Sequence, residues 1–486
     1  MMYIKQIMRN KVNFLQLAFY FLGVIALGAI TGCNKEPMYT PVSFKSTEIS
    51  DFWLEKTSSN PTINRPYQAM ISGDTIRLLV DYGTNITSLE PTIFADADSI
   101  YPTGKQNFSN PVQYRLWANG QTATYTVRIT VSQIQNPVIT SIAAGFDHIM
   151  AVKNDGTVWV CGSNESGQLG LGDYSGRVRL TQVPVYNAEK IYTGGAATFI
   201  RLKDGSVWGS GNQYGQLGLG NKNPISILTR VPFLDNATDI GITFTEVIAL
   251  KADGTIWGAG RNASRILAQG DGDLRATFVK IPIANVKTLS VNFENIIVQK
   301  TNGEVWGWGI NHVGQLGLGD KVRREMPTLL PTPSVGIVEA IAGAGNTFLI
   351  DSNGRIWAVG ANAAGQLGLG DITNRSLFTP ISFFDDKAID RIISRNRGTG
   401  FMDTNGNVWN VGDNVRGQIG IGSKAIQVYT TPVQLSGFTA TTLTGFGDTV
   451  FALKPDGTLW AWGSNSSGVL GTGTDVTDVS SPIQIK

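Results

Sequence analysis

Residues 137–486 alternate short apolar runs with polar turn signals in a pattern that repeats. In the first copy an apolar run is followed by the pair Asp155-Gly156, by Trp159 and by a glycine-rich tail that ends at Gly172. Short runs rich in Val, Ile, Thr and Trp between such turn signals predict β-strands. Because an Asp-Gly pair tolerates the left-handed backbone of a tight hairpin, each copy is predicted to contain a strand, a turn and a returning strand.

The tryptophan recurs seven times, with successive spacings of 49, 49, 49, 51, 52 and 51 residues. Each copy has Val, Ile or Leu before it and an Asp-Gly or Asn-Gly pair upstream; the seven are Trp159, Trp208, Trp257, Trp306, Trp357, Trp409 and Trp460. A unit of three or four short strands cannot bury both of its faces alone, so neighbouring units pack face to face. Seven sheets arranged radially predict a closed seven-bladed β-propeller at 137–486.

Residues 43–132 have no copy of the tryptophan repeat. Several segments alternate apolar and polar residues, and two of them flank Asn119-Gly120, a pair typical of a two-residue hairpin turn. About 90 residues of short strands predict a small β-sandwich of immunoglobulin-like size. The fold class predicted for the whole chain is therefore all-β, a seven-bladed β-propeller preceded by a small immunoglobulin-like β-sandwich.

The first 32 residues are predicted to be a targeting signal. Three basic residues precede an apolar run at 14–27, and small residues lead to Cys33. The stretch 30–33 resembles the lipobox of bacterial lipoproteins, in which the cysteine is acylated and becomes the first residue of the mature chain. A plain secretory signal and a single membrane helix are the alternatives. Residues 33–42 are then a tether, and the resemblance implies a lipid anchor at Cys33.

Charge and cysteine content narrow the function classes. Removal of residues 1–32 leaves 36 basic and 37 acidic residues, a formal charge of −1, so a nucleic-acid partner is not expected. Cys161 is the only other cysteine, which excludes an intrachain disulfide framework in the mature chain. Its place between Trp159 and Gly162 predicts a buried structural thiol.

The register of the repeats, with tails such as Gly167-Gln168-Leu169-Gly170-Leu171-Gly172, resembles the regulator of chromosome condensation family. This resemblance implies a seven-bladed propeller whose two chain ends join in one blade. The strand at 481–485 would then pair with the segment that begins at Pro137. The segment 83–93 resembles the immunoglobulin-like repeats of Bacteroidetes surface lipoproteins, which implies a spacer or an adhesion module on a bacterial outer membrane.

The sequence contains no recognisable catalytic or cofactor motif. The only histidines are His148, at a position where the family's repeats often have a structural histidine, and His312. Neither has a Ser or Asp partner that sequence identifies, and no group of residues has metal-ligand spacing. The Gly-x-Gly pairs recur with the repeats and open no helix, so they are read as turns. No cofactor, no metal and no enzymatic activity are expected, although scattered carboxylates leave an acid–base enzyme open.

The positions that break the repeat are the candidate binding residues. Three phenylalanines each lie nine residues before the turn Asp or Asn, Phe446 is one residue off that register, and several arginines replace repeat glycines. Exposed aromatic rings beside arginine suit protein or glycan binding, whereas packing of the rings at the blade entrance is the structural alternative. The predicted rim comprises Phe146, Phe244, Phe293, Arg261, Arg265, Arg395 and Arg397.

These observations predict a monomeric, lipid-anchored binding scaffold on the bacterial outer membrane whose propeller loops bind an unknown protein or glycan. Guanine-nucleotide exchange is the alternative that the family resemblance implies, although an exported lipoprotein would not meet a cytoplasmic GTPase. A carboxylate-based polysaccharide enzyme is the third hypothesis. Because one fold supports many functions, the site has to decide among them.

Overall fold

The computed structural model describes residues 45–293, 295–333, 336–473 and 478–485. The predicted signal peptide, Cys33 and the tether at 33–42 lie outside the described residues. Residues Ser46–Lys486 form one compact unit. Apart from two short 3-10 helices, η1 (Pro232–Leu234) and η2 (Ser382–Phe384), the described elements are strands, so the chain is all-β as predicted.

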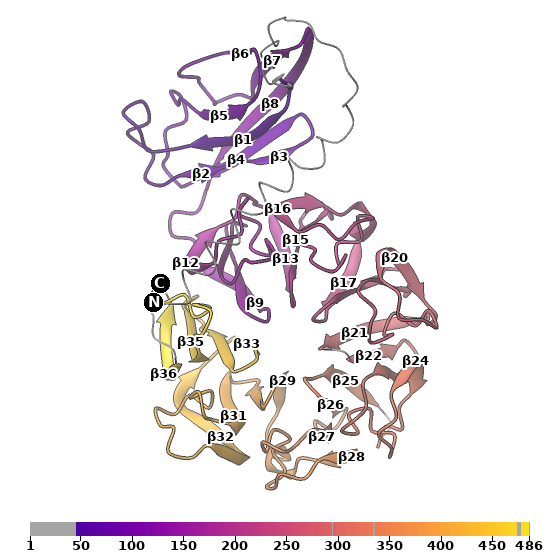
Figure 1. Ribbon diagram of the computed structural model, residues 1–486. Helices are drawn as coiled ribbons and strands as arrows, with labels where there is room; N and C mark the ends of the chain where they lie inside the picture. Colours follow the sequence, from indigo (N-terminus) through magenta and orange to yellow (C-terminus); the bar gives the residue numbers. More distant parts are fainter. Residues whose placement is uncertain (1–44, 294, 334–335, 474–477, 486) are drawn as a thin grey trace, which may run out of the picture. The chain divides into compact units, whose positions relative to one another are not determined.

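Two β-sheets form the N-terminal part of this unit (Figure 1). One has the strand order β2-β1-β5 and the other has the order β3-β4-β8-β7-β6. Apolar side chains from both sheets, among them Phe52 and Leu116, form one buried cluster between the sheets, which makes this part a β-sandwich. The strands are β1 (Ile49–Leu54), β2 (Tyr67–Gln68), β3 (Met70–Ser72), β4 (Thr75–Val80), β5 (Thr92–Ala95), β6 (Ser99–Tyr101), β7 (Val112–Ala118) and β8 (Gln121–Val131).

The predicted hairpin at Asn119-Gly120 joins β7 to β8. Ala118 pairs with Gln121, and the two residues between them have φ angles of 51° and 72°. Two left-handed residues in succession are what a type I′ turn requires, and this is why an Asn-Gly pair occurs here. Strand β4 pairs with β8 in parallel, a neighbour relation that alternation of polarity alone does not predict.

Seven four-stranded antiparallel sheets follow the sandwich, and each is built from consecutive strands of the chain. Blade 1 consists of β9 (Ile139–Ala144), β10 (His148–Lys153), β11 (Val158–Gly162) and β12 (Arg177–Gln182). Blade 2 consists of β13 (Ala188–Thr193), β14 (Ala197–Leu202), β15 (Val207–Gly211) and β16 (Ile225–Arg230). Blade 3 consists of β17 (Ala237–Ile242), β18 (Glu246–Lys251), β19 (Ile256–Gly260) and β20 (Arg275–Ile281).

The remaining blades have the same strand order. Blade 4 consists of β21 (Val286–Asn292), β22 (Asn295–Lys300), β23 (Val305–Gly309) and β24 (Arg324–Leu329). Blade 5 consists of β25 (Ile337–Ala342), β26 (Asn346–Asp351), β27 (Ile356–Gly360) and β28 (Arg375–Pro380). Blade 6 consists of β29 (Ile389–Ser394), β30 (Gly398–Asp403), β31 (Asn407–Asp413) and β32 (Val428–Thr439), and blade 7 of β33 (Thr442–Phe446), β34 (Thr449–Leu453), β35 (Leu459–Ser464) and β36 (Asp478–Ile485).

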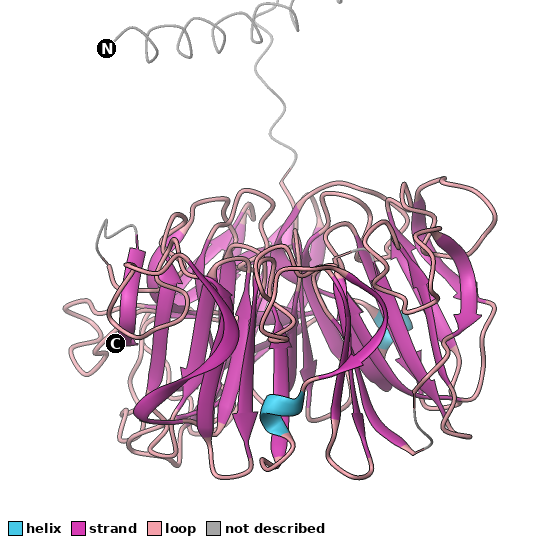
Figure 2. Ribbon diagram, turned by 90° about the horizontal axis from the view of Figure 1, so that it is seen from below, coloured by secondary structure: helices cyan, strands magenta, loops and turns pink. Residues whose placement is uncertain are grey.

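The first strand of every blade lies nearest the centre of the ring, so that β9, β13, β17, β21, β25, β29 and β33 surround its axis (Figure 1). We call the region around this axis the central channel. Seen from the side, the strands run along the ring axis and the connecting loops gather at the two faces (Figure 2). The predicted seven-bladed β-propeller is therefore confirmed. We call the turn that joins the first two strands of a blade its inner turn.

The hairpin at Asp155-Gly156 differs in detail from the prediction. Only Gly156 is left-handed, with a φ of 80°, whereas the Asp155 side chain accepts hydrogen bonds from the backbone nitrogen and the hydroxyl of Thr157, at 2.9 and 2.6 Å. The same hydroxyl accepts a bond from Trp159 Nε1 at 3.0 Å. The Asp-Gly-Thr-x-Trp stretch is thus a local hydrogen-bonded chain that fixes the indole.

A buried asparagine fixes the glycine-rich tail of each repeat to its own blade. In blade 1 Asn164 Oδ1 accepts from the Leu169 nitrogen at 2.9 Å, and Asn164 Nδ2 donates to the Asp173 carbonyl at 2.8 Å. The bond from the leucine or isoleucine nitrogen recurs in all seven blades, and its acceptors are Asn164, Asn212, Asn262, Asn311, Asn362, Asn414 and Asn465. The conformation of the tail therefore depends on one amide per blade.

The end of the tail contacts the next blade. The Gly172 nitrogen donates to the Ser226 carbonyl of blade 2 at 2.8 Å, and tails of later blades repeat this bond to the fourth strand of the following blade. The tail of blade 7 closes the ring in the same way, because the Gly473 nitrogen donates to the Val178 carbonyl of blade 1 at 2.8 Å. The tails of blades 1, 2, 4, 5, 6 and 7 thus each link their own blade to the next one.

The predicted joining of the two chain ends in one blade is wrong. Strand β36 pairs with β35 and stays in blade 7, while β9 pairs with β10 and stays in blade 1. The contact between these blades is made by side chains: Ile142 and Cys161 of blade 1 share a buried cluster with Leu470 and Ile485 of blade 7. The strands of each blade are consecutive in the chain and pair as hairpins. The last blade is built from β33 to β36 alone and contains no strand from the start of the propeller.

Cys161 is fully buried in that cluster, as expected of a structural thiol. Burial raises its pKa to about 12, so the thiolate that reactive cysteines require is suppressed at neutral pH.

We predict that Asn362→Ala lowers the melting temperature markedly. The change removes the acceptor of the Leu367 nitrogen and the donor to the Asp371 carbonyl, and it leaves a buried N–H without a partner. The cost is about 1–3 kcal/mol for each unpaired buried group. Asn353→Ala, in the exposed turn of the same blade, is the matched control with an expected change within about 0.5 kcal/mol. Equal losses in a thermal melt of the two variants would contradict this role of the tail asparagine.

Candidate functional site: the channel mouth

Four phenylalanines from four different inner turns meet at one mouth of the central channel. Phe146 of blade 1 contacts Phe244 of blade 3 and Phe446 of blade 7 edge-on, with ring centroids 5.3 and 5.2 Å apart. Phe293 of blade 4 stacks on Phe446 at 5.3 Å with 22° between the ring planes. Because blades 4 and 7 lie on opposite sides of the ring, this phenylalanine cluster spans the channel.

The rings of the phenylalanine cluster are accessible to solvent. Phe146 and Phe244 are 39% and 41% exposed, and Phe293 and Phe446 are half-buried. The three phenylalanines predicted to lie at one rim therefore do lie together, and Phe446 joins them despite its offset of one residue. The rings pack on one another, as the structural alternative expects. They also remain exposed, as a binding surface requires.

A pocket of about 280 Å³ opens beside the phenylalanine cluster, where blades 5 and 6 have smaller residues in their inner turns. Ala344 and Asn396 stand there at the register position of the phenylalanines, nine residues before the turn Asn. The pocket is lined by Phe293, Asn295, Ile310, His312, Val313, Gln315, Ala344, Gly345, Ala361 and Asn396. The sequence analysis did not predict this pocket. Its cause is the presence of small residues at a position where other blades have phenylalanine, and only the large residues were considered there.

Arg395 is not a rim residue, contrary to the prediction. Its side chain is only 1% exposed, and its guanidinium lies against Gly398, with Nη2 3.4 Å from Asn410 Oδ1. Among the described residues, Nε and Nη1 have no hydrogen-bond partner. Burial lowers the pKa of Arg395 to about 10. The side chain is drawn inward because Gly398 and Gly445, from blades 6 and 7, have no side chains and leave the space that it fills.

The other predicted arginines contact neighbouring loops instead of the phenylalanine cluster. Arg397 is exposed and forms an ion pair with Asp413 at 2.6 Å. Arg261 lies over the Tyr214 ring at 5.8 Å, and Arg265 pairs with Glu325 at 3.1 Å. The exposed pair of Arg265 with Glu325 stabilises the protein by at most about 1 kcal/mol. All three arginines remain exposed and so accessible to a partner.

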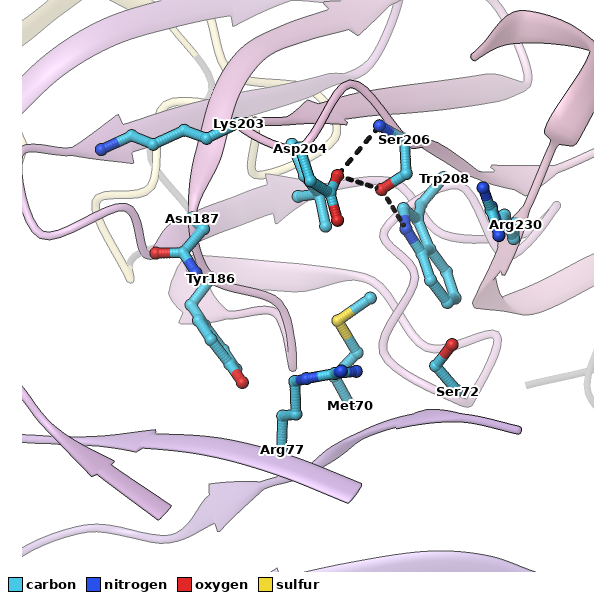
Figure 3. A pocket seen from close by; sticks show the side chains of 11 residues that line it. Met70, Ser72, Arg77, Tyr186, Asn187, Lys203, Asp204, Ser206, Trp208 and Arg230 are labelled. Atoms are coloured by element: carbon cyan, nitrogen blue, oxygen red, sulfur yellow. Dashed lines mark hydrogen bonds between the residues drawn. The ribbon is translucent and has the colours of Figure 1, made fainter. Parts of the chain in front are cut away.

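A second pocket, of about 660 Å³, lies between strands β3 and β4 of the sandwich and blade 2 (Figure 3). Met70 and Arg77 face Tyr186 and the chain of hydrogen bonds from Asp204 through Ser206 to Trp208, which repeats the turn network of blade 1. Nearby, the Arg65 guanidinium lies 5.4 Å from the Trp159 ring and donates to Gln182. No sequence pattern predicts these contacts, because they depend on how the sandwich packs on the blades.

The two histidines differ in environment. His148 is fully buried, with Nε2 2.9 Å from Thr198 Oγ1 of the next blade, so its predicted structural position agrees with its burial. His312 is exposed and lines the pocket beside the phenylalanine cluster. Within the described part of the chain, no group of three or more His, Cys, Asp or Glu residues could hold a metal ion. None of the helices in that part is long and apolar enough to cross a membrane.

Family models match both parts of the chain. Residues 139–168 match one model described as "Regulator of chromosome condensation (RCC1) repeat", and residues 155–199, 302–350 and 456–486 match another of the same description. Residues 58–129 match the model described as "SGBP, N-terminal". The propeller is therefore of the regulator of chromosome condensation type. It follows an N-terminal domain of the kind found in bacterial SGBP proteins, the surface glycan-binding proteins of Bacteroidetes.

Solved structures support the fold. Prp20p from Saccharomyces cerevisiae, described with its binding to Gsp1p and histones, superposes with a TM-score of 0.63 at 18% identity over 69% of this chain and 87% of that chain. Human WBSCR16 gives a TM-score of 0.58 at 17% identity over 70% and 92% of the two chains. At these identities the similarity shows the fold alone.

Curated relatives match over limited stretches. The X-linked retinitis pigmentosa GTPase regulator of Canis lupus familiaris is 35% identical over 107 residues, which are 22% of this chain and 11% of that protein. The ultraviolet-B receptor UVR8 of Arabidopsis thaliana is 26% identical over 309 residues, 63% of this chain and 60% of the receptor. The chain thus spans less than two thirds of the length of these relatives.

We predict that Arg395→Met leaves the melting temperature unchanged or raises it. Replacing a buried charge by an apolar side chain of similar volume is neutral or stabilising by up to about 4 kcal/mol. Arg395→Ala is the comparison, because it leaves a cavity beside Gly398 and Gly445 and is expected to cost about 2 kcal/mol or more. A clear fall in the melting temperature of the methionine variant below that of the unmodified protein would show that the charge itself is needed.

His148 predicts a loss of stability in weak acid. Burial lowers its pKa to about 4, so the unfolded chain takes up the proton first as the pH falls below 6.5. The free energy of unfolding should therefore fall between pH 6.5 and pH 4 by about 3 kcal/mol from this group. His148→Asn, with the residue that blades 4 and 5 have at this position, should lose less over the same window in denaturant titrations at several pH values. Parallel pH profiles for the two proteins would contradict the prediction.

Proposed function

We propose that the protein is a lipid-anchored binding scaffold of the bacterial outer membrane whose channel mouth binds a glycan or a protein. The match of residues 58–129 to the SGBP N-terminal model supports surface association and glycan recognition. In this proposal acylated Cys33 anchors the chain, the sandwich acts as a spacer and the propeller contacts the partner. The protein acts as a monomer without a cofactor and without catalysis.

The observation that supports this function best is the convergence of four phenylalanines at the channel mouth. Burying apolar surface stabilises a fold by about 25 cal/mol per Å², so a phenylalanine ring that stays about 40% exposed gives up part of that stabilisation. Contiguous exposed aromatic surface of this kind marks binding sites in soluble proteins, and aromatic side chains dominate binding energy where they occur at an interface. A propeller that served only as a spacer would have no use for such a cluster.

We predict that the double substitution Phe146→Ser and Phe244→Ser abolishes partner binding. Losing one aromatic anchor typically costs about 2 kcal/mol or more, or about 30-fold in affinity. Binding would be measured on a glycan array and by titration with the surface components of the native cell. The matched control replaces Phe94 and Phe383, which are 50% and 40% exposed on the sandwich and on η2, by Ser.

Two results would reject this function. Undiminished binding by the channel-mouth variant would place the binding surface elsewhere, and equal loss in the control variant would indicate a general effect of surface polarity.

The same preparations, incubated with a panel of polysaccharides, also test the enzymatic alternative. Asp147 is the carboxyl group to examine there, because its pKa is raised. Burial and the neighbouring Glu165 raise this pKa by more than the hydrogen bond from Ser467 lowers it. Guanine-nucleotide exchange has no support beyond the family resemblance.

A further inference from the structure

The pocket beside the phenylalanine cluster is lined in part by apolar side chains. Phe293 contributes a ring, and Ile310 and Val313 contribute aliphatic side chains from the tail of blade 4. Phe293 has a φ of 45°, a left-handed conformation that bulky residues rarely adopt and that costs about 1–3 kcal/mol. Its stacking on Phe446 holds the ring in place despite this cost. Strain of this kind is concentrated at binding sites, where it fixes a side chain in the conformation that a ligand needs.

Polar side chains also line the pocket. Asn295 is only 2% exposed, and its Oδ1 has no hydrogen-bond partner among the described residues. Gln315 also lines the pocket, and its Oε1 accepts a hydrogen bond from the Val313 nitrogen. His312 and Asn396 are exposed at the rim. An unpaired buried acceptor costs about 1–3 kcal/mol, so a ligand that donates a hydrogen bond to Asn295 Oδ1 recovers this energy on binding.

Charge and size restrict the ligand further. None of the described residues that line the pocket is Lys, Arg, Asp or Glu. From these residues an acidic or basic ligand would gain no ion pair in return for its lost hydration. The volume of about 280 Å³ lies just below the range of about 300–1,000 Å³ that is typical of drug-sized ligands, so the pocket has room for one ring and not for a chain of rings.

We propose that this pocket binds the terminal ring of a neutral glycan. One face of a pyranose presents C–H groups, which pack against the negative face of an aromatic ring such as that of Phe293. Its hydroxyl groups both donate and accept, so they satisfy the Asn295 amide whichever of its terminal atoms faces the ligand. The inference rests on the proposed function and deepens it: the phenylalanine cluster contacts the rest of the glycan, while the pocket recognises its end.

A protein side chain fits the same pocket less well. An apolar or aromatic side chain would pack on Phe293 but would leave Asn295 Oδ1 buried and without a hydrogen bond. A charged side chain would bring an unpaired charge against the apolar wall. A sugar ring combines an apolar face with several hydroxyl groups, and this matches a pocket that is lined by both apolar and polar side chains.

The test uses full-length protein in detergent and single-ring probes. Saturation-transfer NMR with the methyl glycosides of glucose, galactose, mannose and N-acetylglucosamine is expected to show binding of at least one of them. Methyl glucuronide tests a charged ring, and N-acetyltyrosinamide tests a protein side chain. Since the four glycosides are uncharged, their affinity should not change with salt concentration.

Ala361→Phe fills the pocket from its wall and should weaken glycoside binding at least 10-fold. Ala363→Phe, exposed and two residues away, does not line the pocket and should leave binding unchanged. His312→Ala removes one hydrogen-bonding group at the rim and should weaken binding by about 2- to 10-fold. The Phe146→Ser and Phe244→Ser variant should keep glycoside binding, because neither side chain lines the pocket.

The outcomes separate the two proposals. Glycoside binding that is lost in Ala361→Phe and kept in Ala363→Phe supports the pocket. Binding that survives in Ala361→Phe, or that occurs only with N-acetyltyrosinamide or methyl glucuronide, overturns it. If polysaccharides bind on the array in a manner that depends on the phenylalanines while no glycoside binds, the proposed function stands and the pocket proposal fails. If a glycoside binds in the pocket but the phenylalanine variant retains polysaccharide binding, the pocket proposal stands and the proposed role of the phenylalanine cluster fails.

Discussion

The propeller depends on the buried asparagine that starts each glycine-rich tail. Its amide fixes the tail to its own blade, and the end of the tail then donates a backbone hydrogen bond to the next blade, as Gly172 does to Ser226. Buried backbone groups must be paired, so a tail in another conformation would leave both the blade and the contact between blades incomplete. One side chain per repeat thus couples folding within a blade to assembly of the ring. The inner turns, and with them the channel mouth, are positioned by this arrangement.

Blade 3 shows that a departure in sequence need not be a departure in structure. Its tail lacks the Gly-Gln-Leu-Gly motif, yet Asn262 still accepts from the Leu267 nitrogen at 3.0 Å. Arg265 and Ala268 adopt φ angles of 56° and 55°, the left-handed conformation that glycine has at these positions elsewhere. The hydrogen bonds of the asparagine hold the same backbone in spite of the cost of left-handed residues without glycine.

Seven blades, their turns and the shared register of three phenylalanines could be predicted from the sequence, because each is set by residues close together in the chain. Contacts between distant blades could not be predicted. Arg395 is buried because Gly398 and Gly445 leave space for it, and the stacking of Phe293 on Phe446 requires a closed ring. The pocket was hidden for the same reason. The pocket lies where Ala344 and Asn396 replace the phenylalanine that other blades have at this position. A small residue in the sequence does not indicate a pocket until its neighbours in space are known.

The closure of the ring has a consequence for how such a protein can change in evolution. Because β9 and β36 remain in their own blades, every blade is encoded by one uninterrupted stretch of the gene. The bond from Gly473 to Val178 is of the same kind as the bonds between other neighbours. Duplication or loss of one repeat would therefore change the circumference of the ring without requiring any strand to exchange partners. Channel width, and with it the set of side chains that meet at the mouth, is a quantity that gene duplication can adjust one blade at a time.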